Sequence, residues 1–293
     1  MDMRTLLSRY GEQATIVALG CGLAALRWWT EPRATGLITL AVVAGVVRAW
    51  SGFSHLGRTL WLGAAGHDMT WRAYRDPDRT VAKDRSRDKD FEFLVSQMCR
   101  VEERVEAFAG ETGMRRISLS VAGGRIGTWD DASSVRLGRR GHVTLGHIWL
   151  WPERHAVMPY ILEHELAHLR RHDSHTRLAA EVIGVVLMVL CTGLLPLGRA
   201  AGVLAGLGAL WVAYLWWSEV ACDRAAARRC GREVAVASWQ QALEDARHVP
   251  PVRRLICAFW ALRSHPPLRL RLWLSRLAPP ADRDHAMPLA REI

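Results

Sequence analysis

The residues whose types and spacing point most directly to chemistry lie in the segment ILEHELAHLRRHDSH, residues 161–175. This segment contains a His-Glu-x-x-His pattern at His164, Glu165 and His168. On an α-helix, side chains four residues apart lie on one face, about 5–6 Å apart at their Cβ atoms, so both imidazoles can bind one metal ion. Glu165 then lies beside the metal and can act as general base toward an attacking water, as in zinc-dependent hydrolysis. The competing interpretation is a solvated helix that bears two unrelated histidines.

A third ligand is needed, because catalytic zinc sites combine three protein ligands with one water. The segment SEVACDR, residues 218–224, follows a long apolar run. A glutamate facing inward at the end of such a helix is costly unless a positive group lies near it, so Glu219 is the predicted third ligand. Asp223, one turn later on the same face, is expected to accept the free N–H of a ligating histidine. The alternative is that both acids are ordinary charges on a helix that leaves the membrane.

Four apolar runs must position these residues. The runs are Ala14–Leu26, Ala34–Val47, Val182–Gly198 and Ala200–Trp217. The last two show no polar face and approach the roughly twenty residues that a membrane helix needs. We therefore expect four transmembrane helices in two hairpins. A signal peptide is the alternative for the first run, and a buried soluble hairpin is the alternative for the last two.

The runs divide the protein into four parts. These are an N-terminal transmembrane hairpin (1–57), a soluble part with a small sheet and the HELAH helix (58–177), a second transmembrane hairpin (178–217) and a C-terminal helical part of the catalytic domain (218–293). Both hairpins return the chain to one side of the membrane. Of the arginines, only Arg27, Arg33 and Arg199 lie in the loops on the opposite side. By the positive-inside rule, the catalytic domain is expected in the cytoplasm, as part of a multi-pass protein of the cell membrane.

The soluble part is predicted to combine helix and strand. Residues 91–109 place apolar side chains at helical spacing with charges between them, which indicates an amphipathic helix. Arg116–Ala122 and His142–Trp149 have the alternation or the β-branched content of strands. The connection between them, residues 123–141, is rich in Gly, Asp, Ser and Arg. We therefore expect a small sheet directly before the metal helix.

Composition excludes some partners and cofactors. The 293 residues are 50% hydrophobic and 23% charged, and the net charge of +10 comes almost wholly from arginine. These arginines are scattered and no recognised nucleic-acid motif accompanies them, so nucleic acid is not an expected partner. The six cysteines form no CxxC pair. Neither a disulfide framework nor a cysteine zinc cluster is therefore predicted, and reduced thiols in the cytoplasm are the simpler account.

The order of these elements resembles a known family. Two spans, a small soluble region, HELAH at 164–168, two more spans and EVACD at 219–223 are similar to the HtpX-type membrane zinc peptidases, kin of the CAAX prenyl endopeptidases. The segment RSHPPL, residues 263–268, is similar to the Ser/Thr-His-Pro-Pro element that this family carries near its C-terminus. The resemblance extends over most of the sequence. It implies a mainly α, integral membrane protein with a cytoplasmic α+β catalytic domain of the zincin type.

The resemblance also implies roles for individual residues. Zinc is expected to be bound by His164, His168 and Glu219. Glu165 is then the base, and His265 donates a hydrogen bond to the oxyanion of the tetrahedral intermediate. A turn-forming role without catalysis is the alternative for His265.

The implied substrate is a polypeptide, membrane proteins included, bound at the bilayer surface. It is expected to bind as an added β-strand beside the strand that precedes the metal helix, here residues 142–149 with Val143 and Leu145. One departure from the family pattern leaves substrate preference open. The Asn-Ala segment usual upstream of that strand is missing, and residues 128–135 read TWDDASSV instead. A role in membrane protein quality control fits such an activity.

Other functional classes remain open. EHELAHLRRHD and EVACD also resemble parts of the BlaR-type sensor peptidases, which are membrane zinc proteases of signalling. That assignment leads us to expect an extracellular sensor domain, and no outer segment is long enough for one, so the HtpX-type resemblance is favoured. A zinc-binding but inactive membrane scaffold would show metal without turnover. A non-metal membrane transporter or adaptor would show neither.

Overall fold

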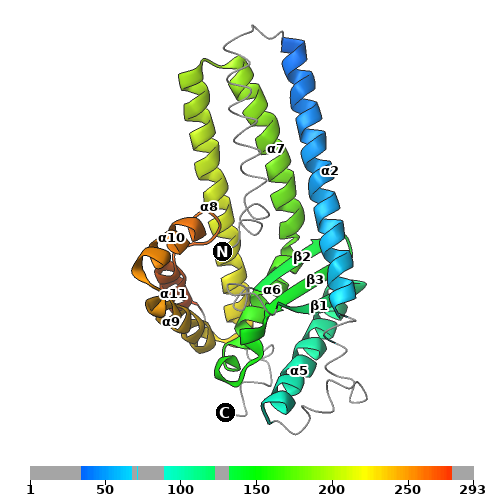
Figure 1. Cartoon of the computed structure of the whole chain (residues 1–293), viewed down its shortest axis with the longest axis vertical. Coiled ribbons are helices and arrows are strands. Elements are labelled where there is room, and N and C mark those ends of the chain that lie inside the picture. Colours follow the sequence, from blue (N-terminus) through cyan, green and yellow to red (C-terminus); the bar gives the residue numbers. More distant parts are fainter. Residues whose placement is uncertain (1–33, 68–70, 72–88, 123–131, 279–293) are drawn as a thin grey trace. The chain divides into compact units, whose positions relative to one another are not determined.

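The computed structural model describes residues 34–67, 71, 89–122 and 132–278. The predicted first membrane run, Ala14–Leu26, lies outside these residues. The described part is mainly helical with one small sheet, which confirms the expected balance of helix and strand (Figure 1). Its helices are α2 (Ala34–Gly66), α5 (Lys89–Thr112), α6 (Met158–Arg171), α7 (Asp173–Leu194), α8 (Leu197–Cys230), α9 (Arg232–His248), α10 (Pro251–Ala261) and α11 (Leu268–Arg276). Its strands are β1 (Arg116–Ala122), β2 (Ala132–Leu137) and β3 (Arg140–Gly146).

Three of the described helices, α2, α7 and α8, are long and apolar enough to cross a membrane. Their bounds differ from the predicted runs because helix continues where apolar sequence stops. α2 extends to Gly66, and α8 runs without interruption to Cys230. No Gly or Pro occurs between Ala209 and Cys230, so nothing in the backbone ends α8 where the charges begin. The predicted third ligand therefore belongs to the same helix as the apolar run before it.

The protein divides into two compact units. In the first unit, which includes residues 34–55 and 176–211, α2 and α7 approach closely at small residues. A Cβ added at Gly45 would lie 2.8 Å from the side chain of Val186, and one at Gly52 would lie 2.1 Å from that of Leu178. Glycine at a contact between apolar helices lets the backbones approach, which is a common packing device in membranes. The side chains of Arg48 and Glu181 form an ion pair between the same two helices.

The second unit, which includes residues 56–175 and 212–278, contains the sheet. The strand order is β1-β3-β2, with β1 parallel and β2 antiparallel to β3. The core on the sheet is formed by buried residues that include Trp71, Met98, Phe108, Leu119 and Leu162. α6 packs on this core through Leu162, Leu166 and Leu169, because these residues recur at helical spacing on one face.

The sheet corrects two predictions. The strand expected at 142–149 begins earlier, at Arg140, and ends at Gly146, and residues 147–150 form a 3₁₀ turn. The segment between the two predicted strands also contains a third strand, β2, which the sequence did not reveal. Its residues ASSVRL lack strong strand propensity, and pairing with β3 stabilises the strand from outside.

The position of β3 also corrects the predicted substrate strand. Val143 and Leu145 are fully buried, and β3 is hydrogen-bonded to β1 on one side and to β2 on the other. A strand paired on both sides has no free N–H or C=O for an added peptide. Among the described strands, only β1 and β2 have an outer edge.

The C-terminal helices build a second, smaller core beside α6. α9 packs against α11, and a cluster of buried residues joins them to α6 and α8. Its members include Tyr160, Ala226, Ala227, Ala235 and Trp239. The indole N–H of Trp239 donates to the Tyr160 hydroxyl at 3.0 Å. This core therefore brings the end of α8 and the start of α11 to the metal helix.

Candidate metal centre

The local structure of α6 positions the two histidines. Leu162, Leu166 and Leu169 face the sheet core, while His164 and His168, four residues apart, face α8. The helix ends at His172, which has a left-handed backbone conformation with φ 57° and ψ 33°. Among the described residues it is the one non-glycine with positive φ. After this residue α7 begins at Asp173, whose carboxylate lies 2.6 Å from Nδ1 of His168.

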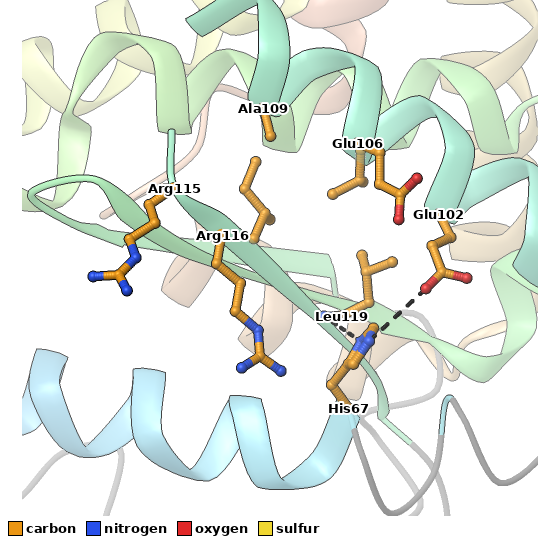
Figure 2. A pocket seen from close by; sticks show the side chains of 9 residues that line it. His67, Glu102, Glu106, Ala109, Arg115, Arg116 and Leu119 are labelled. Carbon is orange, nitrogen blue, oxygen red and sulfur yellow. Dashed lines mark hydrogen bonds and ion pairs between the residues drawn. The ribbon is translucent and has the colours of Figure 1, made fainter. Parts of the chain in front are cut away.

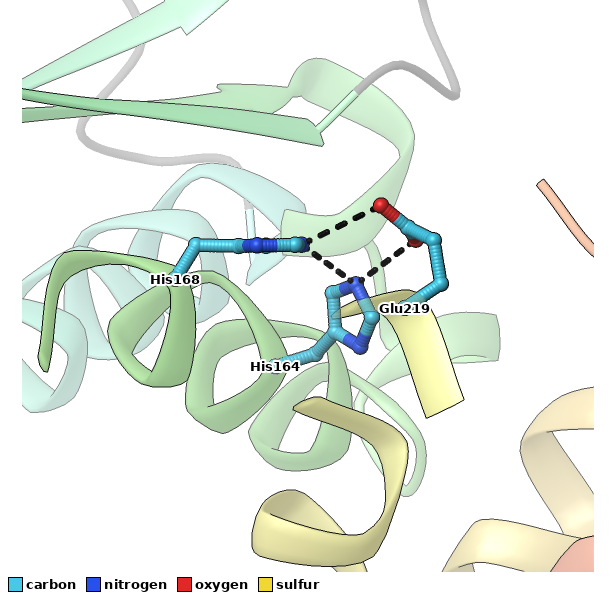
Figure 3. A group of neighbouring side chains, drawn as sticks. All are labelled: His164, His168 and Glu219. Carbon is cyan, nitrogen blue, oxygen red and sulfur yellow. Dashed lines mark hydrogen bonds and ion pairs between the residues drawn. The ribbon is translucent and has the colours of Figure 1, made fainter. Parts of the chain in front are cut away.

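The three predicted ligands lie together (Figure 3). Nε2 of His164 is 3.2 Å from Nε2 of His168. Nε2 of His164 is 3.4 Å from Oε2 of Glu219, and Nε2 of His168 is 3.4 Å from the other carboxylate oxygen, Oε1. With zinc–ligand bonds of about 2.0–2.1 Å, the corners of a tetrahedron lie about 3.3–3.4 Å apart. The two imidazole nitrogens therefore have the separation of neighbouring zinc ligands, and the carboxylate of Glu219 lies beside both of them.

Each of the two histidines has a carboxylate close to its Nδ1 atom, on the side of the ring opposite Nε2. Nδ1 of His164 lies 2.9 Å from Asp223 Oδ1. Nδ1 of His168 lies 2.6 Å from Asp173 Oδ2, which also accepts a hydrogen bond from the Ser218 hydroxyl at 2.8 Å. A carboxylate at Nδ1 places the proton there and leaves Nε2 as the ligand atom. Asp223, the predicted partner of a ligating histidine, thus contacts His164. Asp173 is the corresponding partner of His168.

Arg271 of α11 neutralises this acidic group. Its side chain is buried and donates two hydrogen bonds to Asp223, at 2.7 Å and 2.6 Å. The same guanidinium lies 3.6 Å from Glu219 Oε2, and its Cζ lies 3.8 Å from the centre of the Trp239 ring. A planar guanidinium suits both the bidentate pair and the stacking. The acids on α8 are therefore stable in the interior because α11 supplies a fixed positive charge.

The carboxylates change the titration of the groups around them. Burial lowers the pKa of His164, but the neighbouring Asp223 and Glu219 outweigh it and raise that pKa to about 10. For Arg271, burial opposes the charge, and the contact with Asp223 raises the pKa above its usual value. In the metal-free protein His164 is thus protonated at neutral pH. Metal binding must then displace a proton.

The two predicted catalytic residues lie at the same site. Glu165, the residue after His164, is buried, and its backbone carbonyl oxygen accepts a hydrogen bond from the Ser134 hydroxyl of β2 at 2.9 Å. His265 lies in the turn between α10 and α11 and is half exposed. Its Nε2 is 3.5 Å from Glu219 Oε2, while its Nδ1 pairs with the Ser264 hydroxyl at 2.8 Å. The substrate-strand residues Val143 and Leu145 are the predicted site residues that the structure leaves in the sheet core.

Sequence reasoning missed three residues of the site: Asp173, Cys222 and Arg271. Cys222 Sγ lies 3.3 Å from His168 Nδ1, so Cys222, His168 and Asp173 form a second group that could hold a metal. The separation of 2.6 Å between His168 Nδ1 and Asp173 Oδ2 is that of a short hydrogen bond. It is well below the tetrahedral edge of about 3.3 Å. We therefore interpret this second group as support for His168.

A separate cavity of about 270 Å³ lies between α5, β1 and the end of α2 (Figure 2). It is lined by charged residues that include His67, Glu102, Glu106, Arg115 and Arg116. Nδ1 of His67 accepts the N–H of Leu119 at 3.1 Å, which covers the outer edge of β1 at that point. None of the metal-centre residues lines this cavity. The edge of β2 is therefore the better candidate for strand addition near the metal.

Comparison with known proteins found no match for this sequence among protein-family models, curated proteins or solved structures.

Proposed function

We propose that the protein is an integral membrane zinc endopeptidase of the HtpX type, with four membrane spans and its catalytic domain on the cytoplasmic side. The observation that carries the proposal is the grouping of two imidazole nitrogens, 3.2 Å apart, with the carboxylate of Glu219, which has one oxygen 3.4 Å from each nitrogen. Among the described residues, no fourth His, Cys, Asp or Glu joins this group. A structural zinc site closes all four positions, whereas a catalytic one leaves a position for water.

Each residue of the centre has a defined task in this proposal. When bound, zinc supplies a Lewis acid that activates a water molecule and polarises the scissile carbonyl group. Asp223 and Asp173 hold the two imidazoles with Nε2 toward the donor group. Glu165 takes the proton of the attacking water and delivers it to the leaving amine. His265 donates a hydrogen bond to the developing oxyanion.

The substrate is a polypeptide that adds to the outer edge of β2. The N–H of Arg136 donates to the Ser174 hydroxyl at 3.1 Å, so it points away from β3. Because strand geometry repeats every two residues, the backbone groups of Ser134 and Ala132 point to the same outer side. Ser134 also contacts the carbonyl of Glu165. A peptide paired with this edge therefore runs beside the metal helix.

The test compares metal content with peptide cleavage in detergent-purified full-length protein. Wild type is expected to bind about one zinc per molecule and to cleave an unfolded, fluorescein-labelled casein. Glu165→Gln should retain zinc and lose about 100- to 10,000-fold in kcat. His164→Ala should lose both zinc and cleavage. Glu153→Gln, which changes an exposed glutamate outside the site in the same way, should resemble wild type.

Three results would reject the proposal or part of it. Cleavage by Glu165→Gln at the wild-type rate contradicts the role of the base. Zinc bound at one per molecule without any cleavage by wild type indicates the inactive scaffold. Absence of zinc from wild type after incubation with the metal contradicts the centre itself.

A further inference from the structure

The helix α10 has an apolar face on its surface. Val252, Leu255, Ile256 and Phe259 recur at the i, i+3, i+4, i+7 spacing that aligns side chains along one side of a helix. Their exposed fractions are 72%, 73%, 51% and 65%. A water-soluble surface seldom presents four large apolar side chains in one contiguous stripe. The stripe therefore indicates an interaction surface.

The charged residues of α10 itself have one sign. Arg253 and Arg254 are exposed and flank the apolar stripe on the helix. No Asp or Glu occurs between Asp245 and Asp282 along the sequence. An amphipathic helix with arginines beside a stripe of Leu, Ile and Phe is typical of helices that lie in the headgroup layer of a membrane. Anionic lipid headgroups are the complementary partner for such a surface.

A second, independent contact links α10 to the end of the apolar run of α8. The indole N–H of Trp216 in α8 donates to the carbonyl oxygen of Leu262, directly after α10, at 2.8 Å. Trp216 and Trp217 end the uncharged run of α8, which is one of the helices able to cross a membrane. Tryptophans at the ends of membrane helices lie at the interface between lipid and water. The contact therefore joins the end of α10 to that interface.

We propose that α10 is an interfacial helix that docks on an anionic bilayer surface. Its apolar stripe faces the acyl chains, and Arg253 and Arg254 bind lipid phosphates. The docked helix also borders the metal centre, because the N–H of His265 donates to the carbonyl oxygen of Ala261 in the last turn of α10, at 2.7 Å. A bilayer surface is favoured over a protein partner because it matches the single sign of charge and the position at the end of an apolar span.

The experiment uses two reporter positions on opposite sides of α10. Cys257 is exposed on the side of the arginines, and Leu255 belongs to the apolar stripe. The full-length protein is prepared with Cys21, Cys99, Cys191 and Cys230 replaced by alanine and the buried Cys222 kept. A nitroxide is attached at Cys257, or at Leu255→Cys combined with Cys257→Ala. Both proteins are placed in nanodiscs of phosphatidylcholine alone, or of equal parts phosphatidylcholine and phosphatidylglycerol.

The readout is the collision of each nitroxide with oxygen, which partitions into lipid, and with a water-soluble nickel complex. In the anionic nanodiscs, the oxygen-to-nickel ratio at position 255 should exceed that at position 257 by about tenfold. In phosphatidylcholine alone the difference should shrink. Arg253→Gln with Arg254→Gln should remove this dependence on lipid charge. Arg224→Gln with Arg228→Gln, which removes two exposed arginines of α8, should preserve it.

Three outcomes would overturn the proposal. Equal and high nickel collision at both positions means that α10 lies in water. Shielding of position 255 from both reagents means that protein covers the stripe, either another segment of the same molecule or a second copy. An oxygen-to-nickel ratio that is the same in both nanodiscs means that anionic lipid is not the partner.

Discussion

At the residue scale, the metal centre depends on charges that compensate one another. Three carboxylates, Glu219, Asp223 and Asp173, approach two imidazoles. Arg271 pairs with Asp223 and Glu219, and Arg171 pairs with Asp173. Carboxylates in the interior are stable when they are paired and hydrogen-bonded. The same acids that fix the histidines also keep a proton on His164 when no metal is bound. A metal ion bound here would therefore compete with a proton for one imidazole.

This competition predicts that zinc binding releases protons. The pKa of His164 is raised to about 10, so the metal-free imidazole is charged throughout the range below that value, while a ligating imidazole is neutral. Zinc affinity should therefore rise with pH, by up to about tenfold per pH unit around neutrality. Titration calorimetry in two buffers of different ionisation enthalpy should give about one proton released per zinc. A proton count of zero would show that His164 is neutral before the metal binds.

The second prediction at this scale concerns the buried cation. Arg271→Met leaves Asp223 buried without its arginine partner, which should destabilise the fold by about 3–5 kcal/mol and weaken zinc binding. Arg269→Met removes an exposed arginine from the same helix and should change little. Combining Arg271→Met with Asp223→Asn should recover part of the stability, because the unpaired charge is removed. Denaturant unfolding in detergent measures wild type and all three variants, and equal stability of the two single methionine variants would contradict the role given to Arg271.

The sequence predicts the residues of the site that are close to one another along the chain better than those that only folding brings together. His164, Glu165 and His168 are fixed by helical spacing alone, and Glu219 with Asp223 follows from the burial cost of acids after an apolar run. Arg271 had no such signal, because it lies among other arginines in the segment LRLRLWLSR and only the packing of α11 on α9 buries it. Asp173 was hidden because its approach to His168 depends on the left-handed conformation of His172.

At the element scale, the sheet shows why strands are harder to predict than the helices. The long helices have apolar content that continues over many residues, so their existence follows from composition. β2 is six residues long and polar, and it is a strand because β3 pairs with it and Ser134 and Arg136 anchor it to α6. The contacts with α6 come from residues more than thirty positions away in the sequence. The missed strand is also the one whose edge is nearest the metal helix.

If the substrate pairs with the outer edge of β2, removing one backbone N–H from that edge should lower activity. Ser134→Pro removes an N–H that points away from β3, so the sheet should keep its internal hydrogen bonds while substrate pairing is lost. We expect kcat/KM to fall by about tenfold or more, with zinc content unchanged. Ser134→Ala keeps the N–H and removes only the hydroxyl, and it should stay within a few-fold of wild type. Equal activity of the two variants would place the substrate elsewhere.

At the scale of the whole molecule, the path of the backbone decides which segments would share a side of a membrane that α7 and α8 cross. The two-residue turn at Leu195 and Pro196 separates α7 from α8, so the segments before α7 and after α8 lie on one side if both helices cross. That side carries most of the arginines, while Arg199 is the one charge next to the turn. The asymmetry predicts that the metal centre faces the cytoplasm. This predicted orientation depends only on α7 and α8, and it does not require the predicted first membrane run.

Cysteine labelling in intact cells tests this orientation. Cys257 is exposed on α10, and a side chain at Gly198 would meet nothing within 4 Å, so both positions accept a reagent. With Cys21, Cys99, Cys191 and Cys230 replaced by alanine, a membrane-impermeant maleimide should label Gly198→Cys (combined with Cys257→Ala) in intact cells. Cys257 should react only after permeabilisation. The reverse pattern would place the arginine-rich side outside, where a cytoplasmic peptidase cannot work, and would require the arginines near α10 to bind the outer leaflet instead.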